Sequence, residues 1–173
     1  MDKLVEVDAQ YREWISEVSK RFHQSQIKAA VKVNDEMLRF YWQLGKELHD
    51  RKDKFSYGQS FYKTISRDLR RELPDVKSFS ETNLRYMQKF AELYSEVSNF
   101  PQLGEDFRNE EIEPLFAIPW GHHKIIIDKC NGNPKKAVFF VNQVIQNNWS
   151  RAVLLNFLDT DLYCLLYTSP SPR

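Results

Sequence analysis

The sequence predicts an all-α fold: a multi-helix domain with helix-turn-helix-like units and a loop-rich acidic segment in the middle. Apolar residues recur at spacings of three and four through most of the chain, which is typical of amphipathic helices. Glycine is scarce, at 5 of 173 residues, which argues against a turn-dense β fold. An apolar fraction of 42% allows a single core. We expect a helical domain over residues 1–158 and a tail over 159–173.

Two helices are expected in the N-terminal third. The first covers residues 8–22, with an apolar stripe that includes Trp14 and Phe22. The second and longer one covers residues 25–51, where Asn34 and Asp35 interrupt the stripe and predict a kink or a boundary. Gly45 costs roughly 1 kcal/mol against alanine inside a helix, so it indicates close packing by another element.

A third helix is expected at about residues 59–72, ended by Pro74, because proline cannot continue the helical hydrogen-bond ladder. The next helix follows Ser80, a good N-cap, with Phe79 and Leu84 spaced as a hydrophobic staple. Its predicted buried face comprises Leu84, Met87, Phe90, Ala91 and Tyr94. The residues expected largely off that face are Thr82, Arg85, Gln88 and Lys89.

This helix, break, N-capped helix pattern is that of a helix-turn-helix, although the break of about six residues exceeds the three or four of the tight motif. A tighter rival lies further along the chain. There, residues 134–146 form a predicted helix, 147–149 a short turn, and Ser150 caps a short helix over residues 151–158. The sequence leaves open which unit binds a partner.

Charge is unevenly distributed, although the net charge is only +1. Residues 51–90 carry ten Lys and Arg against five Asp and Glu, and residues 91–118 carry one Arg against seven acids. Such asymmetry can steer a polyanion to one face, although solvated helix faces are an equally good interpretation. The residues predicted to contact nucleic acid, with DNA favoured, are Lys63, Arg67, Arg70, Arg71, Thr82, Asn83, Arg85 and Lys89. For Asn83, a structural role in the first turn is an equal alternative.

Residues 98–119 are acidic, punctuated by proline and expected to be a loop, after which Trp120 opens another helix. Adjacent residues on a helix point about 100° apart, so we do not expect His122 and His123 to bind one metal ion together. We expect Trp120 to act as a packing anchor and the two histidines to cap or rim the helix start. No catalytic, disulfide or zinc motif is present, so we expect no enzyme chemistry, metal or cofactor.

The N-terminus lacks an apolar signal region, and no run approaches the ~18 apolar residues of a membrane span. A cytoplasmic protein without a membrane partner is therefore expected. Residues 159–173 show no helical period. The segment from Cys164 onward resembles a translated sequencing adapter, so we expect the natural protein to continue beyond about Asp159. A natural disordered tail is the alternative.

Several dispersed blocks, in their order and spacing, resemble the N-terminal domain of the YhcG-like family, over about residues 10–158. They are Tyr41-Trp42-Gln43-Leu44-Gly45; Tyr57-Gly58 with Ile65-Ser66-Arg67-Asp68-Leu69; Phe79-Ser80 with Asn83-Leu84, Met87 and Phe90; Pro119-Trp120-Gly121-His122-His123; and Asn147-Asn148-Trp149-Ser150-Arg151 with Leu154. These are bacterial proteins whose C-terminal half is a PD-(D/E)XK-type nuclease domain. The resemblance implies a helical module that supports or targets a nuclease. We find no strand-like segment with the acids and lysine of that nuclease in this chain, so its activity is not carried over.

The favoured interpretation is therefore a DNA-binding or targeting module of a nuclease-linked bacterial protein. The alternative is a protein-interaction or dimerisation module without direct nucleic-acid contact, favoured by the aromatic content and the long helix over residues 25–51. Under either interpretation a homodimer or a nuclease domain is an expected partner. A catalytic domain in its own right is the weakest of the three hypotheses.

Overall fold

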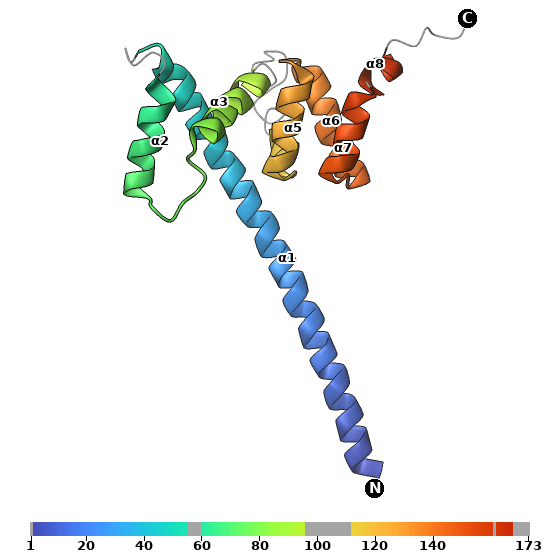
Figure 1. The fold of residues 1–173 in the computed structure, drawn as a ribbon. Helices are drawn as coiled ribbons and strands as arrows, with labels where there is room; N and C mark the ends of the chain where they lie inside the picture. The colour runs from blue at the N-terminus through green and yellow to red at the C-terminus, as the bar shows by residue number, and fades with distance from the viewer. Residues whose placement is uncertain (1, 55–59, 96–111, 161, 168–173) are drawn as a thin grey trace, which may run out of the picture.

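The computed structural model describes residues 2–54, 60–95, 112–160 and 162–167. In that part of the chain every regular element is a helix, which confirms the predicted all-α class. Figure 1 shows a very long helix, α1 (Asp2–Lys52), whose N-terminal part projects beyond the shorter helices. The shorter helices lie on both sides of α3 (Glu81–Ser95). They are α2 (Phe61–Glu72), η3 (Glu113–Phe116), α5 (Trp120–Cys130), α6 (Pro134–Asn147), α7 (Arg151–Asp159) and α8 (Leu162–Tyr167).

The long helix α1 is continuous, so the predicted boundary between residues 22 and 25 is wrong. No glycine or proline precedes Gly45 to interrupt it. A boundary at Asn34 and Asp35 is also absent, and both side chains have partners of their own. The Asn34 amide donates to two backbone carbonyls near η3, at 3.4 and 3.2 Å. The Asp35 carboxylate pairs with Arg39 one turn later, at 2.9 Å. Polar residues here mark the point where α1 meets the rest of the fold.

The crossing of α1 and α3 is built around Gly45, which confirms its predicted role in close packing. A Cβ atom at Gly45 would lie 2.7 Å from the Met87 carbonyl carbon and 3.0 Å from the Ala91 Cβ. Beside this contact Trp42 packs edge-on against Phe90, with ring centroids 5.3 Å apart. The absence of a side chain at one position therefore lets two backbones approach and lets large aromatic rings fill the space around them.

Helix α3 forms as predicted. Ser80 caps it, with its hydroxyl oxygen accepting from the Asn83 backbone N–H at 3.2 Å. All five residues of its predicted apolar face are buried. Gln88, however, was expected off that face and is buried as well. The reason is α2, whose Tyr62 hydroxyl donates to the Gln88 side-chain oxygen.

The C-terminal helices begin and end at the predicted signals. Asn133 caps α6 by accepting from the Lys136 backbone N–H at 3.0 Å, and Ser150 caps α7 by accepting from Val153 at 3.3 Å. Between these helices Asn148 adopts a positive φ of 50°, a conformation that asparagine tolerates better than most residues. Residues 98–111 of the predicted acidic loop lie outside the described residues.

The segment after Asp159 differs from its prediction, because residues 162–167 form the short helix α8. Tyr163 lies against Phe139 of α6, with ring centroids 5.4 Å apart. The local sequence has no helical period here, so we attribute the stability of this short helix to its contact with α6. Among the described residues, none of the helices combines the length and apolar character that crossing a bilayer requires.

His122 and His123 were predicted to cap or rim the start of α5. Both are instead buried in the core. His123 is fully enclosed, and its Nε2 donates to the Leu115 carbonyl at 2.6 Å. His122 donates likewise to the Trp149 carbonyl at 2.8 Å. Trp120 packs as the predicted anchor, with its ring centroid 5.0 Å from that of Tyr41 and 5.4 Å from that of Phe90. The two halves of the chain therefore share one aromatic core.

Candidate nucleic-acid interface

The outer face of α2 carries four of the predicted site residues. Tyr62 and Ser66 face the core, and Ser66 donates to the Phe79 carbonyl at 2.6 Å, which ties α2 to the segment before α3. The opposite side of the helix exposes Lys63, Arg67, Arg70 and Arg71. A helix whose inner face is fixed by packing presents its outer cations at set positions.

Acidic neighbours reduce the charge of this face only in part. Arg67 pairs with Asp68 at 3.0 Å, and Arg71 lies 4.0 Å from both Asp68 and Glu72. These side chains are between 43% and 74% exposed. Exposed pairs of this kind contribute little, typically about 0–1 kcal/mol, so a polyanion could displace them. Four cations against two acids leave the face of α2 net positive.

On α3 the exposed predicted residues are Thr82, Arg85 and Lys89. Arg85 lies over the Tyr62 ring of α2, with its guanidinium carbon 4.1 Å from the ring centroid. Stacking leaves the N–H groups at the edge of the guanidinium plane available, because the ring occupies only its face. Tyr62 is therefore a platform that holds Arg85 across the two helices.

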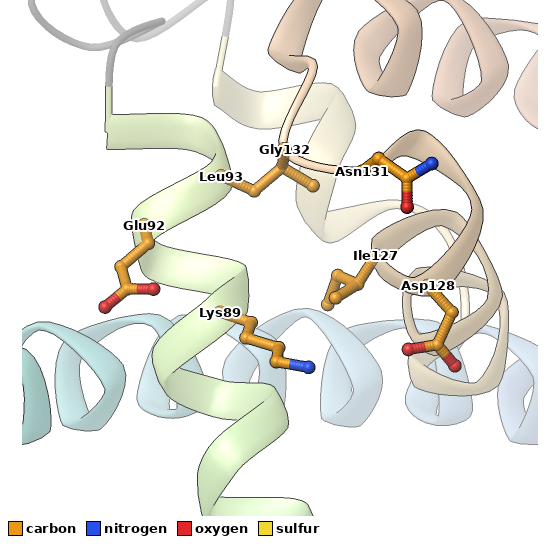
Figure 2. Close-up of a pocket in the computed structure, with 7 residues that line it drawn as sticks. All are labelled: Lys89, Glu92, Leu93, Ile127, Asp128, Asn131 and Gly132. Atoms are coloured by element: carbon orange, nitrogen blue, oxygen red, sulfur yellow. The ribbon is translucent and has the colours of Figure 1, made fainter.

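Lys89 lies one turn later and leans to the other neighbour of α3. Figure 2 shows its side chain reaching toward α5 across a cleft of about 390 Å³, where Asp128 lies opposite. Two lysines lie near the Tyr86 ring, whose centroid is 5.7 Å from Lys89 Nζ and 5.5 Å from Lys124 Nζ. Tyr86 itself donates to Asp128 at 2.7 Å, and this hydrogen bond raises the pKa of the Tyr86 phenol. Arg85 and Lys89 thus share a helix but have different surroundings.

Of the two alternatives for Asn83, the structure favours the structural one. The residue is only 8% exposed, and both ends of its amide are engaged within the fold. Its Nδ2 donates to the Ser78 carbonyl at 2.7 Å, and its Oδ1 accepts from Trp120 Nε1 at 2.8 Å. Asn83 therefore joins the start of α3 to the start of α5, which is a structural role.

The rival unit, α6 and α7, has the tighter connection, with residues 148–150 between its helices. Its second helix is poorly charged, however. The ionisable residues of α7 are Arg151 and Asp159, and Asp159 is paired with Lys129 at 2.7 Å. Val153 and Leu155 are exposed on the same helix, at 39% and 37%. The distribution of positive charge therefore favours α2 and α3 over α7 as a nucleic-acid interface.

Two residues near the candidate interface were missed by reasoning from the sequence. Tyr62 was not singled out, because it precedes the basic residues and its partners Arg85 and Gln88 are more than 20 residues away. Lys124 lies outside the basic block of residues 51–90 and reaches Tyr86 only through the packing of α5 on α3. The one available signal for Tyr62 is its place beside Phe61 on the inner side of an amphipathic helix.

The fold and this exposed basic face define an all-α module built on one long helix. Residues 17–164 match the family described as the DUF1016 N-terminal domain, so the chain belongs to that family. This is the N-terminal domain of the YhcG-like family, a nuclease-associated group, which confirms the resemblance seen in the sequence. Neither curated proteins nor solved structures show a significant match to the chain.

Proposed function

We propose that α2 and α3 form the nucleic-acid-binding face of a helix-turn-helix-like module that targets a nuclease, with DNA as the favoured ligand. The observation that carries the proposal is the set of six exposed cations on two helices packed against each other. They are Lys63, Arg67, Arg70, Arg71, Arg85 and Lys89. Each helix is held in place by the packing of its buried face. The backbone positions of the cations are therefore fixed relative to one another.

The two helices contribute differently to this proposal. The exposed cations of α2 suit phosphate contacts, which fix position without reading sequence. Arg85 suits a more specific contact, because its stacking on Tyr62 lowers the entropy cost of holding the guanidinium in one place. Thr82 lies in the first turn of α3, where backbone N–H groups and the helix dipole also favour a phosphate.

Fluorescence anisotropy with labelled duplex DNA at several salt concentrations tests the proposal. Affinity should fall as salt rises, with a log–log slope near −0.9 per phosphate contact. Replacing Arg67, Arg70 and Arg71 together by alanine should weaken binding about equally for all sequences and make the slope shallower by up to about 3. Arg85→Ala should weaken binding too, and Arg85→Lys should not restore it, because lysine does not stack in the same way.

A control removes two positive charges from the projecting part of α1. Lys20→Ala with Lys28→Ala neutralises two exposed cations of α1, far from α2 and α3, and should leave affinity nearly unchanged. Thr82→Ala should reduce binding without reducing stability, whereas Asn83→Ala should do the reverse. Equal losses from the α1 control and the α2 variants, or no binding at low salt, would refute the proposal.

The proposal assigns binding and targeting to these residues and assigns phosphodiester cleavage to a nuclease domain that the module serves. Its support is membership of a nuclease-associated family. Supercoiled plasmid incubated with the chain and Mg²⁺ should remain uncut. Metal-dependent nicking that survives further purification would instead give this chain a catalytic role. Parallel titrations with duplex RNA and single strands would identify the preferred nucleic acid.

A further inference from the structure

The N-terminal part of α1 carries a long apolar stripe that nothing in the described chain covers. All residues from 9 to 33 are exposed, and Figure 1 shows this part of the helix standing away from the others. Large apolar side chains recur along it at helical spacing and continue toward the core end of α1. They are Tyr11, Trp14, Ile15, Val18, Phe22, Val33, Met37 and Phe40. Tyr11 and Phe22 are 58% and 59% exposed, and Val33 is 62% exposed.

The size of this stripe exceeds what a monomer usually leaves open. Four of the eight residues are aromatic, with side chains of about 150–250 Å² when free, and the other four are smaller aliphatic ones. At exposed fractions of 37% to 62%, the eight together expose roughly 700 Å². The largest apolar patch on a typical monomer is about 300–600 Å². A standard protein interface buries about 800 Å² on each partner, so the stripe alone supplies most of one such surface. Helices also gain most of their stability in proteins by packing an amphipathic face.

We propose that this stripe pairs with the same stripe of a second copy of the chain, as an antiparallel helix pair with its two-fold axis between Ser25 and Gln26. About that axis most of the large side chains of the stripe meet apolar partners, while Ile15 would lie opposite Glu36 at the edge of the pair. Tyr11 would lie opposite Phe40 of the second copy, and Val18 opposite Val33. Phe22 would lie opposite Ala29, where the small side chain leaves room for the large ring. The polar Ser25 and Gln26, which interrupt the stripe, would meet each other at the axis. A parallel pair would instead set Phe22 against Phe22 and leave a gap at Ala29.

The apolar character of the stripe makes this association distinct from nucleic-acid binding. Arg21 and Lys32 flank the stripe on the same side of the helix. Each of them has an acid one turn away on its own helix, Glu17 and Glu36 respectively, so these edge charges largely offset one another in the pair. Salt screens these charges and leaves the apolar contact in place, so self-association should not weaken as salt rises. The nucleic-acid binding proposed above should weaken under the same change, so the two proposals can fail independently.

Sedimentation equilibrium of the whole chain across the micromolar range tests the pairing. We expect a monomer–dimer equilibrium, with the dimer dissociation constant raised on the order of 100-fold by Val18→Glu with Phe22→Glu, equivalent to about 2.7 kcal/mol. Gln24→Glu, which adds one negative charge on another side of the same helix, should change it little. Both wild-type side chains are exposed, so unfolding of the shorter helices should keep its midpoint. A strict monomer, or a dimer unaffected by the double variant, would refute the proposal.

Cysteine cross-linking in a Cys164→Ser background tests the orientation. Cys130 is buried, and burial raises its pKa to about 11, so it should not react. Ser25→Cys should form a disulfide-linked dimer under mild oxidation, because residue 25 lies beside the axis. Tyr11→Cys should not, because the two residues would lie at opposite ends of the pair. Ready cross-linking through residue 11, a dimer that dissociates as salt rises, or a monomer that binds anionic vesicles instead would each contradict the proposed pair.

Discussion

At the scale of single residues, Gly45 sets how closely α1 and α3 approach. Gly45→Ala would place a Cβ against the backbone of Met87, with 2.7 Å to its carbonyl carbon. Alanine favours a helix by about 1 kcal/mol over glycine, but forced overpacking costs typically 1–3 kcal/mol or more. We expect the net effect to be a loss of stability of about 2 kcal/mol, measured by urea denaturation.

Gly121 provides the matched control. A Cβ there would meet the side chain of Arg151, with 3.1 Å to its Cδ, and that exposed chain can move aside. Gly121→Ala should therefore be close to neutral. If the two alanine variants lose equal stability, backbone contact at Gly45 is not the cause of its effect.

His123 links acid sensitivity to the core. Burial lowers the pKa of His123 to about 4, although the hydrogen bond to Leu115 acts in the opposite direction. The ordinary pKa is about 6.5, so between these values the unfolded chain takes up a proton that the folded chain does not. The free energy of unfolding should therefore be highest above pH 6.5, and this one group should lower it by roughly 3 kcal/mol as the pH drops toward 4.

His123→Gln keeps a donor for the Leu115 carbonyl and removes the titration. Its stability should be lower at neutral pH but flatter between pH 6.5 and 4, as measured by denaturation at each pH. His23→Gln, on the exposed part of α1, should keep the wild-type slope. An unchanged slope in His123→Gln would show that other groups cause the acid sensitivity.

At the scale of elements, the start of α3 depends on Ser80. Its hydroxyl accepts from the Asn83 backbone N–H, which otherwise has no partner within the helix. Ser80→Ala should cost about 1 kcal/mol of stability in thermal denaturation, and Ser80→Asp should restore most of it. Equal stability of the alanine variant and the wild type would mean that the packing of α3 alone determines where it begins.

The same helix shows what a sequence can predict and why. The cap at Ser80 and the apolar face of α3 depend on residues within one or two turns of each other. The local sequence pattern was therefore sufficient to predict both. The burial of Gln88 depends on Tyr62, 26 residues earlier, and Asn34 satisfies carbonyls more than 80 residues away. Their polarity predicted exposure for Gln88 and a break at Asn34, because the sequence does not place those distant partners.

The candidate interface divides in the same way. The exposure of the lysines and arginines on α2 and α3 follows from helical spacing alone, and the structure agrees with it. The role of Asn83 does not follow, because Trp120 and Ser78 engage its amide only once the helices have packed. The stacking of Arg85 on Tyr62 likewise requires α2 and α3 side by side. Burial of the two adjacent histidines was missed for the same reason.

At the scale of the whole molecule, the projecting part of α1 should contribute little to the stability of the shorter helices. Removing residues 1–30 leaves Asn34 and Leu38 in place, and the deleted side chains from residue 9 onward are exposed. Measured at a concentration where the chain is monomeric, stability should change by no more than about 0.5 kcal/mol, while the helical circular dichroism signal falls.

A longer deletion, of residues 1–40, also removes Leu38, which is 1% exposed, and the contacts of Asn34 with the carbonyls near η3. That variant should lose several kcal/mol, in line with the cost of removing buried apolar side chains. Large destabilisation by the shorter deletion would mean that the stem of α1 supports the fold directly.

The uninterrupted length of α1 also sets a spacing. A helix rises about 1.5 Å per residue, so in the antiparallel pair the two Gly45 crossings would lie roughly 60 Å apart along the axis. At about 3.4 Å per base pair, that separation corresponds to ~17 base pairs of duplex. Because α3 is fixed to α1 at Gly45, each chain of the pair would carry its basic face near one end of a stiff rod. The length of one helix would thus fix the distance between two points of contact on a nucleic acid.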